Sequence, residues 1–564
     1  MSASLKQPHS EPASHELERQ PTLTRSLSHL GPGVTWFDVD GNGTEDLLIG
    51  NGRNGYQILY LNDGRGGFRA VRPKDRAAGD QTTSLAWHPE PRQVSLLVGN
   101  SCYETVTNTE AAVINQNPRT GEEAPIASMP SSIGPLALTV RDDVPTLFVG
   151  GRVLPGRYPK AASSQLLVYR NGAWALDSAN TSRLRDVGLV SGAVWTDLDG
   201  DGQPDLVLAC EWGPVRVMRF SEGLLEDVTV RWSLARYRGW WNGVATGDFD
   251  GDGRMDLVAS NWGRNTRYQR FLGHPVRVYF GEWSGPGRID LLESYHEESL
   301  GKYVPFQTLD QLRELLPAIA DKFPTFAAYA KAGMQDLLGE FTASSSVLEA
   351  DWLDSTVFLN RGDHFEAFPL PDEAQFAPAF GVSVGDLDGD GFEDIILSQN
   401  FFGVQQETTR LDAGRGLVLR GNGRGGFEPM GGQESGIVLY GEQRGCALAD
   451  YDQDGRLDVA IGQNNGPIGL FHNTGGVPGL RVRLRGPRSN PDGIGAMVRL
   501  RYAGRFGPAR LVQTGSGFWS QDSLVQILGQ AERPLQIWVR WPGGAITTVP
   551  VPDGAREVIV SASD

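Results

Sequence analysis

The sequence predicts an all-β protein: a seven-bladed β-propeller with a helical insertion and a small C-terminal β-domain. Three observations support this. The 564 residues include 72 glycines and 34 prolines, which divide a chain that is 40% hydrophobic into short segments. An acidic nine-residue pattern recurs five times, and an apolar run follows each copy. Turn-rich chains with short apolar segments at repeated intervals are typical of sandwiches, barrels and propellers.

The repeat has the form Asp-x-Asp-Gly-Asp-Gly-x-x-Asp, and each unit reads as strand, tight loop, strand, turn, strand. Two further units keep the apolar frame without the acids, which gives seven. A unit of this size matches one propeller blade, and radial closure protects sheet edges that would otherwise aggregate. A linear β-solenoid would need shorter and more regular repeats. The acidic copies lie at residues 38–46, 197–205, 248–256, 386–394 and 450–458, and the acid-free units at 84–100 and 136–151.

The acidic pattern predicts calcium sites. Side chains at positions 1, 3, 5 and 9 can surround one point, glycines at 4 and 6 permit sharp bends, and the carbonyl of position 7 can add an oxygen. Ca²⁺ prefers six to eight hard oxygen ligands, whereas Mg²⁺ requires a tighter octahedron. An EF-hand would need Glu at position 12, where Leu208 and Ala259 stand. The predicted ligands are Asp38, Asp40, Asn42, Thr44 and Asp46; Asp197, Asp199, Asp201, Gln203 and Asp205; Asp248, Asp250, Asp252, Arg254 and Asp256; Asp386, Asp388, Asp390, Phe392 and Asp394; and Asp450, Asp452, Asp454, Arg456 and Asp458.

One such loop could be a turn that binds nothing, but five spaced copies favour metal. Without an ion, the clustered carboxylates would repel one another and raise each other's pKa. The loops themselves supply too little Lys and Arg to offset this repulsion. We therefore expect about five Ca²⁺ ions, one at each loop.

The interval between Asp248 and Asp386 is more than twice the usual one. Within it, residues 307–339 show a helical period. The sequence predicts an insertion over about 284–344, which Pro317 and Pro324 divide into short helices. We expect it to cover the rim of its own blade; the alternative is a lid or a partner-docking surface. The apolar stripe consists of Leu309, Leu312, Leu316, Ile319 and Phe323, continued by Phe326, Met334, Leu337 and Leu338.

Residues 1–30 form a polar tail with no signal peptide visible, of which residues 21–30 could supply a closing strand to the last blade. Residues 31–475 are assigned to the propeller and residues 476–564, which are basic, to a separate β-domain. No stretch approaches the roughly 18 apolar residues of a membrane span. The formal net charge of -17 argues against a nucleic-acid partner. The three widely spaced cysteines are not a disulfide framework.

Two aromatic and basic segments, residues 236–243 and 260–271, are candidates for a ligand surface. Such side chains could stack on a sugar ring or bind a carboxylate through arginine. The alternative is packing between blades. The residues concerned are Trp240, Trp241, Trp262, Arg264 and Arg267.

No nucleophile elbow, zinc helix, phosphate-binding loop or dinucleotide fingerprint is present, and the eight histidines show no ligand spacing. The sequence therefore favours a binding or scaffold module, with a protein or glycan partner, over an enzyme. A calcium-dependent carbohydrate-active enzyme, similar to a polysaccharide lyase and with its site at the propeller mouth, is the alternative. A purely structural role in surface assemblies is a third.

The acidic loops and the strands after them resemble the FG-GAP/VCBS repeats of integrin-like propellers, over about residues 32–475. The phrase GGRVLPGRYP (150–159) and the insertion resemble the subgroup found beside ASPIC/UnbV domains. The tail resembles an ASPIC/UnbV domain itself. The resemblance, to a bacterial relative of the cartilage acidic protein family, implies a calcium-dependent protein located extracellularly, in the periplasm or at the cell surface. The tail motifs are NPDGIGAMVRLR (490–501), QTGSGFWSQDS (513–523) and VRWPGG (539–544).

Overall fold

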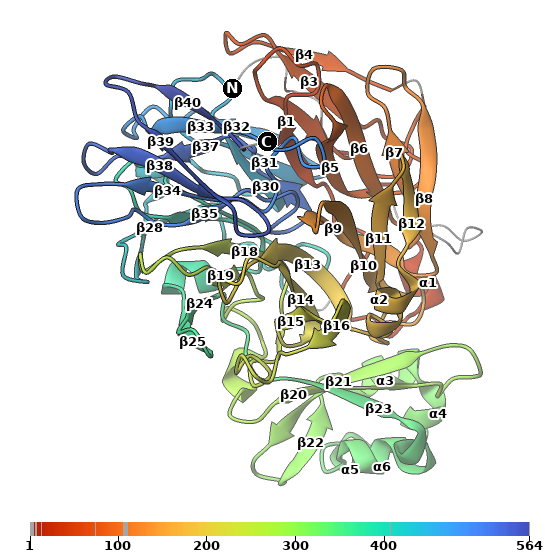
Figure 1. Ribbon diagram of the computed structural model, residues 1–564. Helices are drawn as coiled ribbons and strands as arrows, with labels where there is room; N and C mark the ends of the chain where they lie inside the picture. The colour runs from red at the N-terminus through yellow and green to blue at the C-terminus, as the bar shows by residue number, and fades with distance from the viewer. Residues whose placement is uncertain are drawn as a thin grey trace.

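Seven antiparallel sheets form a ring in the computed structural model, which describes residues 5, 8–12, 14–73, 75–104, 111–405 and 408–562 (Figure 1). The innermost strand of each sheet lies beside the innermost strand of the next, and the last lies beside the first. The prediction of a seven-bladed propeller is therefore confirmed. These innermost strands are β1, β5, β9, β13, β18, β26 and β30.

Blades 1 to 4 follow one another along the chain, each built outward from its innermost strand. A short helix, α2 (Ser178–Arg183), joins blades 3 and 4. The strands are β1 (Val34–Phe37), β2 (Asp46–Ile49), β3 (Ile58–Asn62) and β4 (Phe68–Val71); β5 (Gln81–Glu90), β6 (Gln93–Asn100), β7 (Ala111–Gln116) and β8 (Glu123–Met129); β9 (Ser132–Arg141), β10 (Val144–Val153), β11 (Gln165–Arg170) and β12 (Ala173–Leu176); and β13 (Leu189–Thr196), β14 (Asp205–Gly213), β15 (Arg216–Ser221), β16 (Leu224–Asp227) and β17 (Gly239–Trp240).

Blades 5 to 7 complete the ring. An insertion interrupts blade 5 between its second and third strands, and blade 7 has three strands among the described residues. The strands are β18 (Val244–Gly247), β19 (Asp256–Ala259), β24 (Thr356–Asn360) and β25 (Phe365–Pro369); β26 (Ala379–Gly385), β27 (Asp394–Gln399), β28 (Leu417–Gly421) and β29 (Phe427–Pro429); and β30 (Glu442–Ala449), β31 (Asp458–Asn464) and β32 (Gly469–Phe471). The short helices here are η4 (Asp372–Gln375) and α7 (Gly432–Ser435).

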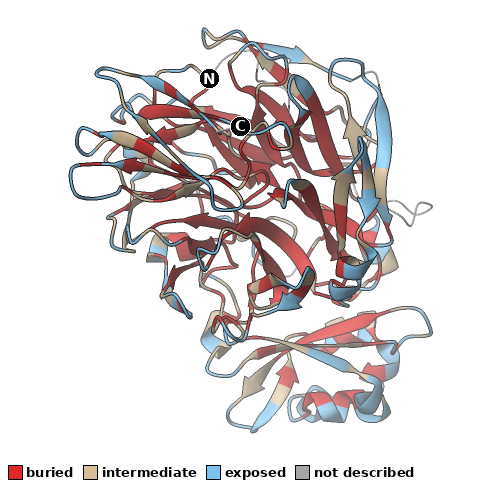
Figure 2. Cartoon of the chain, in the orientation of Figure 1, coloured by how far each residue is buried: buried red, intermediate tan, exposed pale blue. Residues whose placement is uncertain are grey.

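Burial falls from the inside of each blade to the outside (Figure 2). Every residue of β13 is buried, whereas β12, an outermost strand, has no fully buried residue. Innermost strands are covered on both faces by the neighbouring blades and therefore read as continuous apolar runs. Blades 1 and 7 join in the same way: the Trp36 and Tyr451 rings stack at 6.0 Å within one apolar cluster.

The N-terminal tail does not supply the predicted closing strand. Its described residues contain one helix, α1 (Glu16–Arg19), and pair with the blades at isolated bridges such as Arg25 with Val404. Leu23, Leu27 and Leu30 are instead buried in the apolar cluster at the centre of the ring. Three spaced leucines gain more by filling this centre than they would on a half-exposed outer strand.

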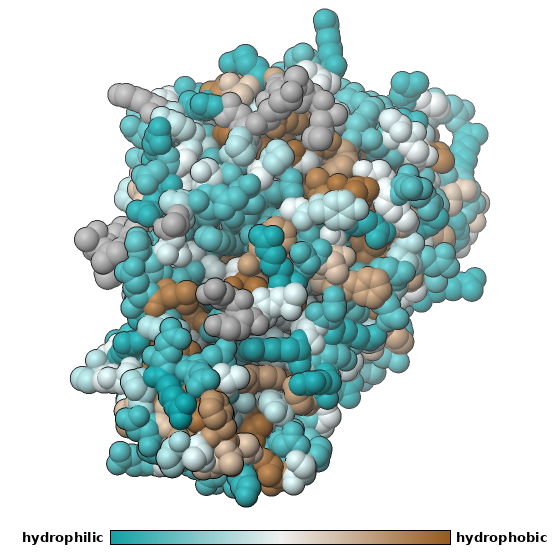
Figure 3. Space-filling model, turned by 180° about the vertical axis from the view of Figure 1, so that it is seen from behind, coloured by the Kyte–Doolittle hydropathy of each residue, from teal (hydrophilic) through white to brown (hydrophobic). Residues whose placement is uncertain are grey.

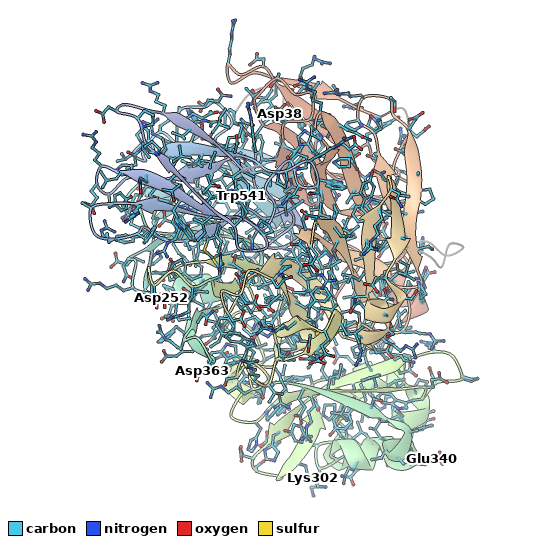
Figure 4. The ribbon with its side chains drawn as sticks, in the orientation of Figure 1. Asp38, Asp252, Lys302, Glu340, Asp363 and Trp541 are labelled. Atoms are coloured by element: carbon cyan, nitrogen blue, oxygen red, sulfur yellow. The ribbon has the colours of Figure 1, made fainter. Side chains whose placement is uncertain are left out.

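The insertion also differs from its prediction. It occupies residues 260–355 and carries its own four-stranded sheet, on which the helices pack. It projects from the ring and does not cover the rim of blade 5, and Figure 4 labels Lys302 and Glu340 at its far end. The predicted stripe is largely buried against this sheet, but Phe326 is exposed. Its elements are η2 (Gln269–Phe271), β20 (Val276–Gly281), β21 (Asp290–Glu297), β22 (Lys302–Pro305), α3 (Leu309–Leu315), α4 (Pro317–Ala320), α5 (Phe326–Tyr329), α6 (Met334–Leu338), η3 (Gly339–Ser344) and β23 (Ser346–Ala350).

The C-terminal region forms two small sheets around a shared apolar core that includes Trp541. No helix within the described ranges is long and apolar enough to cross a membrane. From behind, the surface is mostly hydrophilic, with apolar side chains in small groups (Figure 3). The C-terminal strands are β33 (Leu480–Arg485), β34 (Met497–Arg501), β35 (Arg510–Leu511), β36 (Ser520–Gln521), β37 (Gln526–Leu528), β38 (Gln536–Arg540), β39 (Ile546–Pro550) and β40 (Glu557–Ser561).

Residues 513–523 of this region, here called the central segment, enter the middle of the ring and contact the innermost strand of every blade. Strand β36 pairs with β1, and Phe518 packs on Phe380 of β26 with ring centroids 5.3 Å apart. Trp519 is buried in the cluster that also holds Leu23, so the central segment and the tail fill the centre together. The remaining contacts are hydrogen bonds of Gln521 with Ala86, Thr514 with Leu138, Trp519 with Ser191, Gly517 with Val244, and Ser520 with Cys446.

Candidate metal-binding loops

The five acidic repeats, numbered loops 1 to 5 in chain order, join the first and second strands of blades 1, 4, 5, 6 and 7. All five start and end at the same point of the strand pair. The residue before the first Asp pairs with the ninth-position Asp, which begins the second strand. These pairs are Phe37 with Asp46, Thr196 with Asp205, Gly247 with Asp256, Gly385 with Asp394, and Ala449 with Asp458.

The backbone of each loop wraps around its first carboxylate. In loop 1, Asp38 accepts hydrogen bonds from the N–H groups of Gly41 at 2.8 Å and Gly43 at 2.9 Å. Both glycines have positive φ, 78° and 92°, which side chains with a Cβ rarely adopt. In loop 5, Gln453 takes the first glycine position with φ 62°, and its side chain donates to the Gly43 carbonyl of loop 1 at 2.9 Å.

The position-7 residues support the loops through their N–H groups. Each donates to the side-chain oxygen of position 5 at 2.8–2.9 Å, so the middle ligand is held by its own backbone. In loop 1 the Asn42 amide oxygen also accepts from the Thr44 hydroxyl, at 2.6 Å. The five donors are Thr44, Gln203, Arg254, Phe392 and Arg456.

The ninth-position carboxylates are buried, although each accepts a hydrogen bond from the backbone of its own loop. Burial raises the pKa of Asp46 and Asp205 to about 7, and the pKa of Asp256, Asp394 and Asp458 to about 8. Nearby loop carboxylates push in the same direction. A bound cation would reverse both effects.

The loops bring their carboxylates together as a metal site requires. Ligand oxygens of Asp38, Asp40 and Asp46 lie within 4.8 Å of one another, as do those of Asp197, Asp199 and Asp201. In loop 3, Oδ1 of Asp250 is buried and receives no hydrogen bond from the described residues. Clustered, underused oxygens in a glycine-bent loop fit a hard divalent cation such as Ca²⁺.

Arginines from the third strands also contact these loops. Arg361 lies 2.7 Å from Asp250, and Arg420 lies 2.8 Å from Asp388. Arg219 contacts Asp199 and Asp201. The expectation that little positive charge offsets the acids was therefore wrong, because it considered the loop sequences alone. Such half-exposed pairs contribute only about 0–1 kcal/mol each.

The C-terminal region lies on the loop side of the ring and places one arginine at each loop. Figure 4 shows Asp38 and Asp252, from loops 1 and 3, on the side where Trp541 marks this region. The basic charge of this region therefore faces the acidic loops. The contacts are Arg483 with the Gly43 carbonyl at 3.2 Å, Arg540 with Asp197 at 2.5 Å, Arg499 beside Gly253, Arg510 with Glu393 at 2.7 Å, and Arg481 with Asp450.

Sequence reasoning missed a set of asparagines that connect neighbouring loops. The Asn62 side chain, at the end of β3, donates to the Glu45 carbonyl of loop 1 at 3.0 Å and to the Tyr451 carbonyl of loop 5 at 2.7 Å. Asn360 and Asn473 make equivalent bridges in blades 5 and 7. The recurring phrases LNDG, LNRG and HNTG were the available signal.

The predicted aromatic ligand surface is not an open surface. Trp240 and Trp241 are completely buried and Trp262 nearly so. The guanidinium of Arg25, from the tail, lies 4.6 Å from the Trp240 ring and 4.9 Å from the Trp262 ring. The prediction was wrong because the tail covers Trp240 and Trp262, and Trp241 packs between blades 4 and 5, with its ring 5.6 Å from the Phe358 ring.

The two predicted arginines of that surface are also engaged. Arg264 pairs with Asp354 and Asp372 at 2.8 Å, and Arg267 pairs with Glu293 at 3.1 Å. Their charges hold connecting segments together and are not free to bind a carboxylate ligand.

The centre of the propeller, where the alternative enzyme site was placed, is filled by the tail and the central segment. The nearby base considered, His274, lies on the insertion, with Nε2 3.0 Å from Oε1 of Glu298 and its ring 4.1 Å from the ring of His296. The geometry therefore does not bring His274 and an open central groove together.

Comparisons with known proteins identify the class of this chain. Residues 197–259, which span loops 2 and 3, match the FG-GAP-like repeat family, and residues 486–564 match the ASPIC and UnbV family. The chain thus contains an FG-GAP-like repeat segment within its propeller and an ASPIC/UnbV segment at its C-terminus.

Among curated proteins, the chain resembles cartilage acidic protein 1. It is 23% identical to the Xenopus tropicalis protein over 309 residues, which cover 52% of this chain and 43% of the relative. It is 24% identical to the Homo sapiens protein over 305 residues, covering 50% and 40%. The match thus spans less than half the length of these relatives. Integrin alpha-4 of Xenopus laevis is 31% identical over 121 residues, covering 19% of this chain and 11% of that protein.

Solved structures include distant neighbours. Saccharomyces cerevisiae Sqt1 has a TM-score of 0.38 at 9% identity, covering 82% of this chain and all of that chain. BBS1N, solved in complex with ARL6DN, has a TM-score of 0.37 at 9% identity, covering 81% and 96%.

Proposed function

We propose that loops 1 to 5 bind Ca²⁺ and that the ions fix the connections between the first and second strands of five blades. The observation that carries this proposal is that a buried ninth-position carboxylate recurs in five loops of the same register. The ionised form of a buried carboxyl group is unfavourable at neutral pH unless a cation balances its charge.

Metal analysis after exhaustive dialysis tests the calcium sites. At least five ions per chain are expected, and Asp250→Ala should lose one, because it removes a ligand of loop 3 without touching the others. Asp186→Ala, at an exposed turn before β13, is a matched control that should keep the parent count. Fewer than two ions in the parent would contradict the proposal.

We further propose that the protein acts outside the cytoplasm as a binding or scaffold module for a protein or glycan partner. Its FG-GAP-like and ASPIC/UnbV regions and its similarity to cartilage acidic protein 1 support this. Because the centre of the ring is filled, the partner would contact the outer strands of the blades or the insertion. Calcium would act indirectly by making the blades rigid, since each ion is enclosed by its own loop.

Incubation with uronate polysaccharides separates a binder from a lyase, because a lyase produces an unsaturated product that absorbs ultraviolet light. We expect the absorbance to stay constant, with and without Ca²⁺. Steady growth that Asp250→Ala or His274→Ala reduces would contradict the binding module and favour the enzyme.

A further inference from the structure

Three carboxylates outside the acidic repeats meet beside blade 2. Glu11 belongs to the N-terminal tail, Asp80 precedes β5, and Glu104 follows β6. One ligand oxygen from each lies within 4.8 Å of the other two. No motif relates these residues, so only the fold brings them together.

The three groups are buried. The Glu11 side chain is completely inaccessible to solvent, and Asp80 and Glu104 are 5% and 8% exposed. Acidic side chains at this depth are almost always paired or bound to a metal.

Most of their oxygens face other carboxylate oxygens and not hydrogen-bond donors, because the Asp80 side chain lies within hydrogen-bonding reach of Glu11 and Glu104. Both carboxylate oxygens of Glu11, both of Glu104 and Oδ2 of Asp80 receive no hydrogen bond from a described residue. Only Oδ1 of Asp80 does, from the Arg53 N–H at 2.7 Å. Three clustered carboxylate oxygens, from side chains that together hold five buried oxygens without a donor, define an acceptor-only site, and a cation is the group that such a site fits.

Neighbouring positive groups do not balance this charge. Nε of Arg53 is 3.6 Å from Oε2 of Glu104, and Nε2 of His9 is 3.9 Å from Oε1 of Glu11. Burial lowers the pKa of His9 to about 3, so its ring is neutral at physiological pH. Arg444 also acts on Glu11, but its guanidinium is paired with Glu442 at 2.6 Å, so Arg53 is the one arginine whose pairing is with the three acids among the described residues. Burial and mutual repulsion raise the pKa of Glu11 to about 11 and that of Glu104 to about 9.

The backbone around Glu11 is fixed by two other blades. Its N–H donates to Oδ1 of Asn465 in blade 7 at 2.8 Å, and the Ser10 N–H donates to Oδ1 of Asn51 in blade 1 at 3.0 Å. These two hydrogen bonds thus fix the backbone that holds the Glu11 carboxylate beside Asp80 and Glu104.

We propose that Glu11, Asp80 and Glu104 form an additional divalent-cation site, with Ca²⁺ the expected occupant. The ion would attach the N-terminal tail, which is held by blades 1 and 7, to blade 2. The ion would supply what the five unpartnered oxygens lack. The site shares no residue with loops 1 to 5, so it stands or falls independently of them.

Ion counting on the full chain tests this site. Glu104→Gln and, separately, Glu11→Gln should each bind one ion fewer than the parent, whereas the control Glu226→Gln, on exposed β16, should match it. Each substitution keeps the shape of the side chain and removes one charge. If both variants retain the parent count, the three acids are a protonated cluster and the proposal is overturned.

Hydrogen exchange on the full chain gives a second measurement that does not depend on ion counting. Ca²⁺ should slow exchange of the backbone amides of His9, Ser10 and Glu11 at least 10-fold relative to the chelated protein. The same slowing should be absent in Asp80→Asn, although loops 1 to 5 remain intact there. Equal exchange of the His9, Ser10 and Glu11 amides with and without Ca²⁺ in the parent would overturn the proposal.

Discussion

Blades 1 and 3 connect their first two strands by different means. In blade 3, β9 and β10 continue to a two-residue turn closed by the Arg141–Val144 pair, with Asp142 and Asp143 at positive φ. In blade 1, β1 and β2 stop after four residues and loop 1 takes the place of the turn. Blade 2 has the same kind of connection as blade 3, a two-residue turn at residues 91–92. If loops 1 to 5 bind cations as proposed, cation dependence belongs to individual blades and not to the propeller fold.

Removal of calcium should have the largest effect. Each occupied loop stabilises the fold by about 2.7 kcal/mol at an ion concentration of 100 times Kd. Chelation should therefore lower Tm by on the order of 10 °C. Hydrogen exchange should accelerate in loops 1 to 5 and stay unchanged in the strand pairs β5–β6 and β9–β10, which flank the turns of blades 2 and 3. Uniform acceleration across all seven blades would break the comparison.

The same substitution in a loop and in a hairpin sharpens the comparison further. With Ca²⁺ present, Asp40→Asn in loop 1 should cost about 2–3 kcal/mol, because it removes a ligand charge. Asp143→Asn should change the unfolding free energy by less than about 0.5 kcal/mol, because asparagine tolerates positive φ. In chelator the two variants should behave alike. Urea denaturation measures both, and an Asp40 effect that persists in chelator would contradict the metal role.

The calcium-free protein should lose stability as pH rises. The ninth-position carboxyls have folded pKa values of about 7 to 8, above the ordinary value of about 3.9 for the unfolded chain. Their contribution to stability is fully present below about pH 4 and is lost as pH rises through 7 to 8.

Calcium affinity should increase as pH rises, because calcium binding displaces the protons of these carboxyl groups. Denaturation at pH 5.5 and pH 8 should thus show the gain from Ca²⁺ increasing with pH. A gain that is equal at both values would indicate that the buried carboxyls are not ligands.

The smallest effect is expected at the exceptional residue of loop 5. Gln453→Gly would relieve a positive-φ strain of about 1 kcal/mol but remove the bond to the Gly43 carbonyl, also worth about 1 kcal/mol. The net change in unfolding free energy should be below about 1 kcal/mol. Gly251→Gln, at the equivalent position of loop 3, should cost more, because glutamine there has no adapted partner.

Local features of the fold could be predicted from the sequence. The glycines of the loops have the positive φ values that the repeat implied, and Leu309, Leu312 and Leu316 are buried as their period indicated. Both depend on residues a few positions apart, where sequence spacing fixes spatial relations.

Features that depend on distant residues could not be predicted. Trp240 looked available for a ligand, because nothing near it in the sequence shows that Arg25 stacks on it. Glu11 meets Asp80 only after the ring closes, and the central segment contacts strands from every part of the chain. Asn62 carries a local signal, but its partner Tyr451 is in the last blade.

The central segment also determines when this protein can finish folding. Residues 513–523 follow all seven blades in the sequence, so the ribosome releases them after every strand that they contact. Domains generally begin to fold during synthesis, N-terminal parts first. Until this segment is synthesised, the innermost strands of the seven blades would lack the hydrogen bonds and apolar contacts that it provides. Its insertion can follow only after all seven blades are synthesised, and strands β37 to β40 of the C-terminal sheets come later still. A chain that lacks the segment should remain a target for chaperones and proteases.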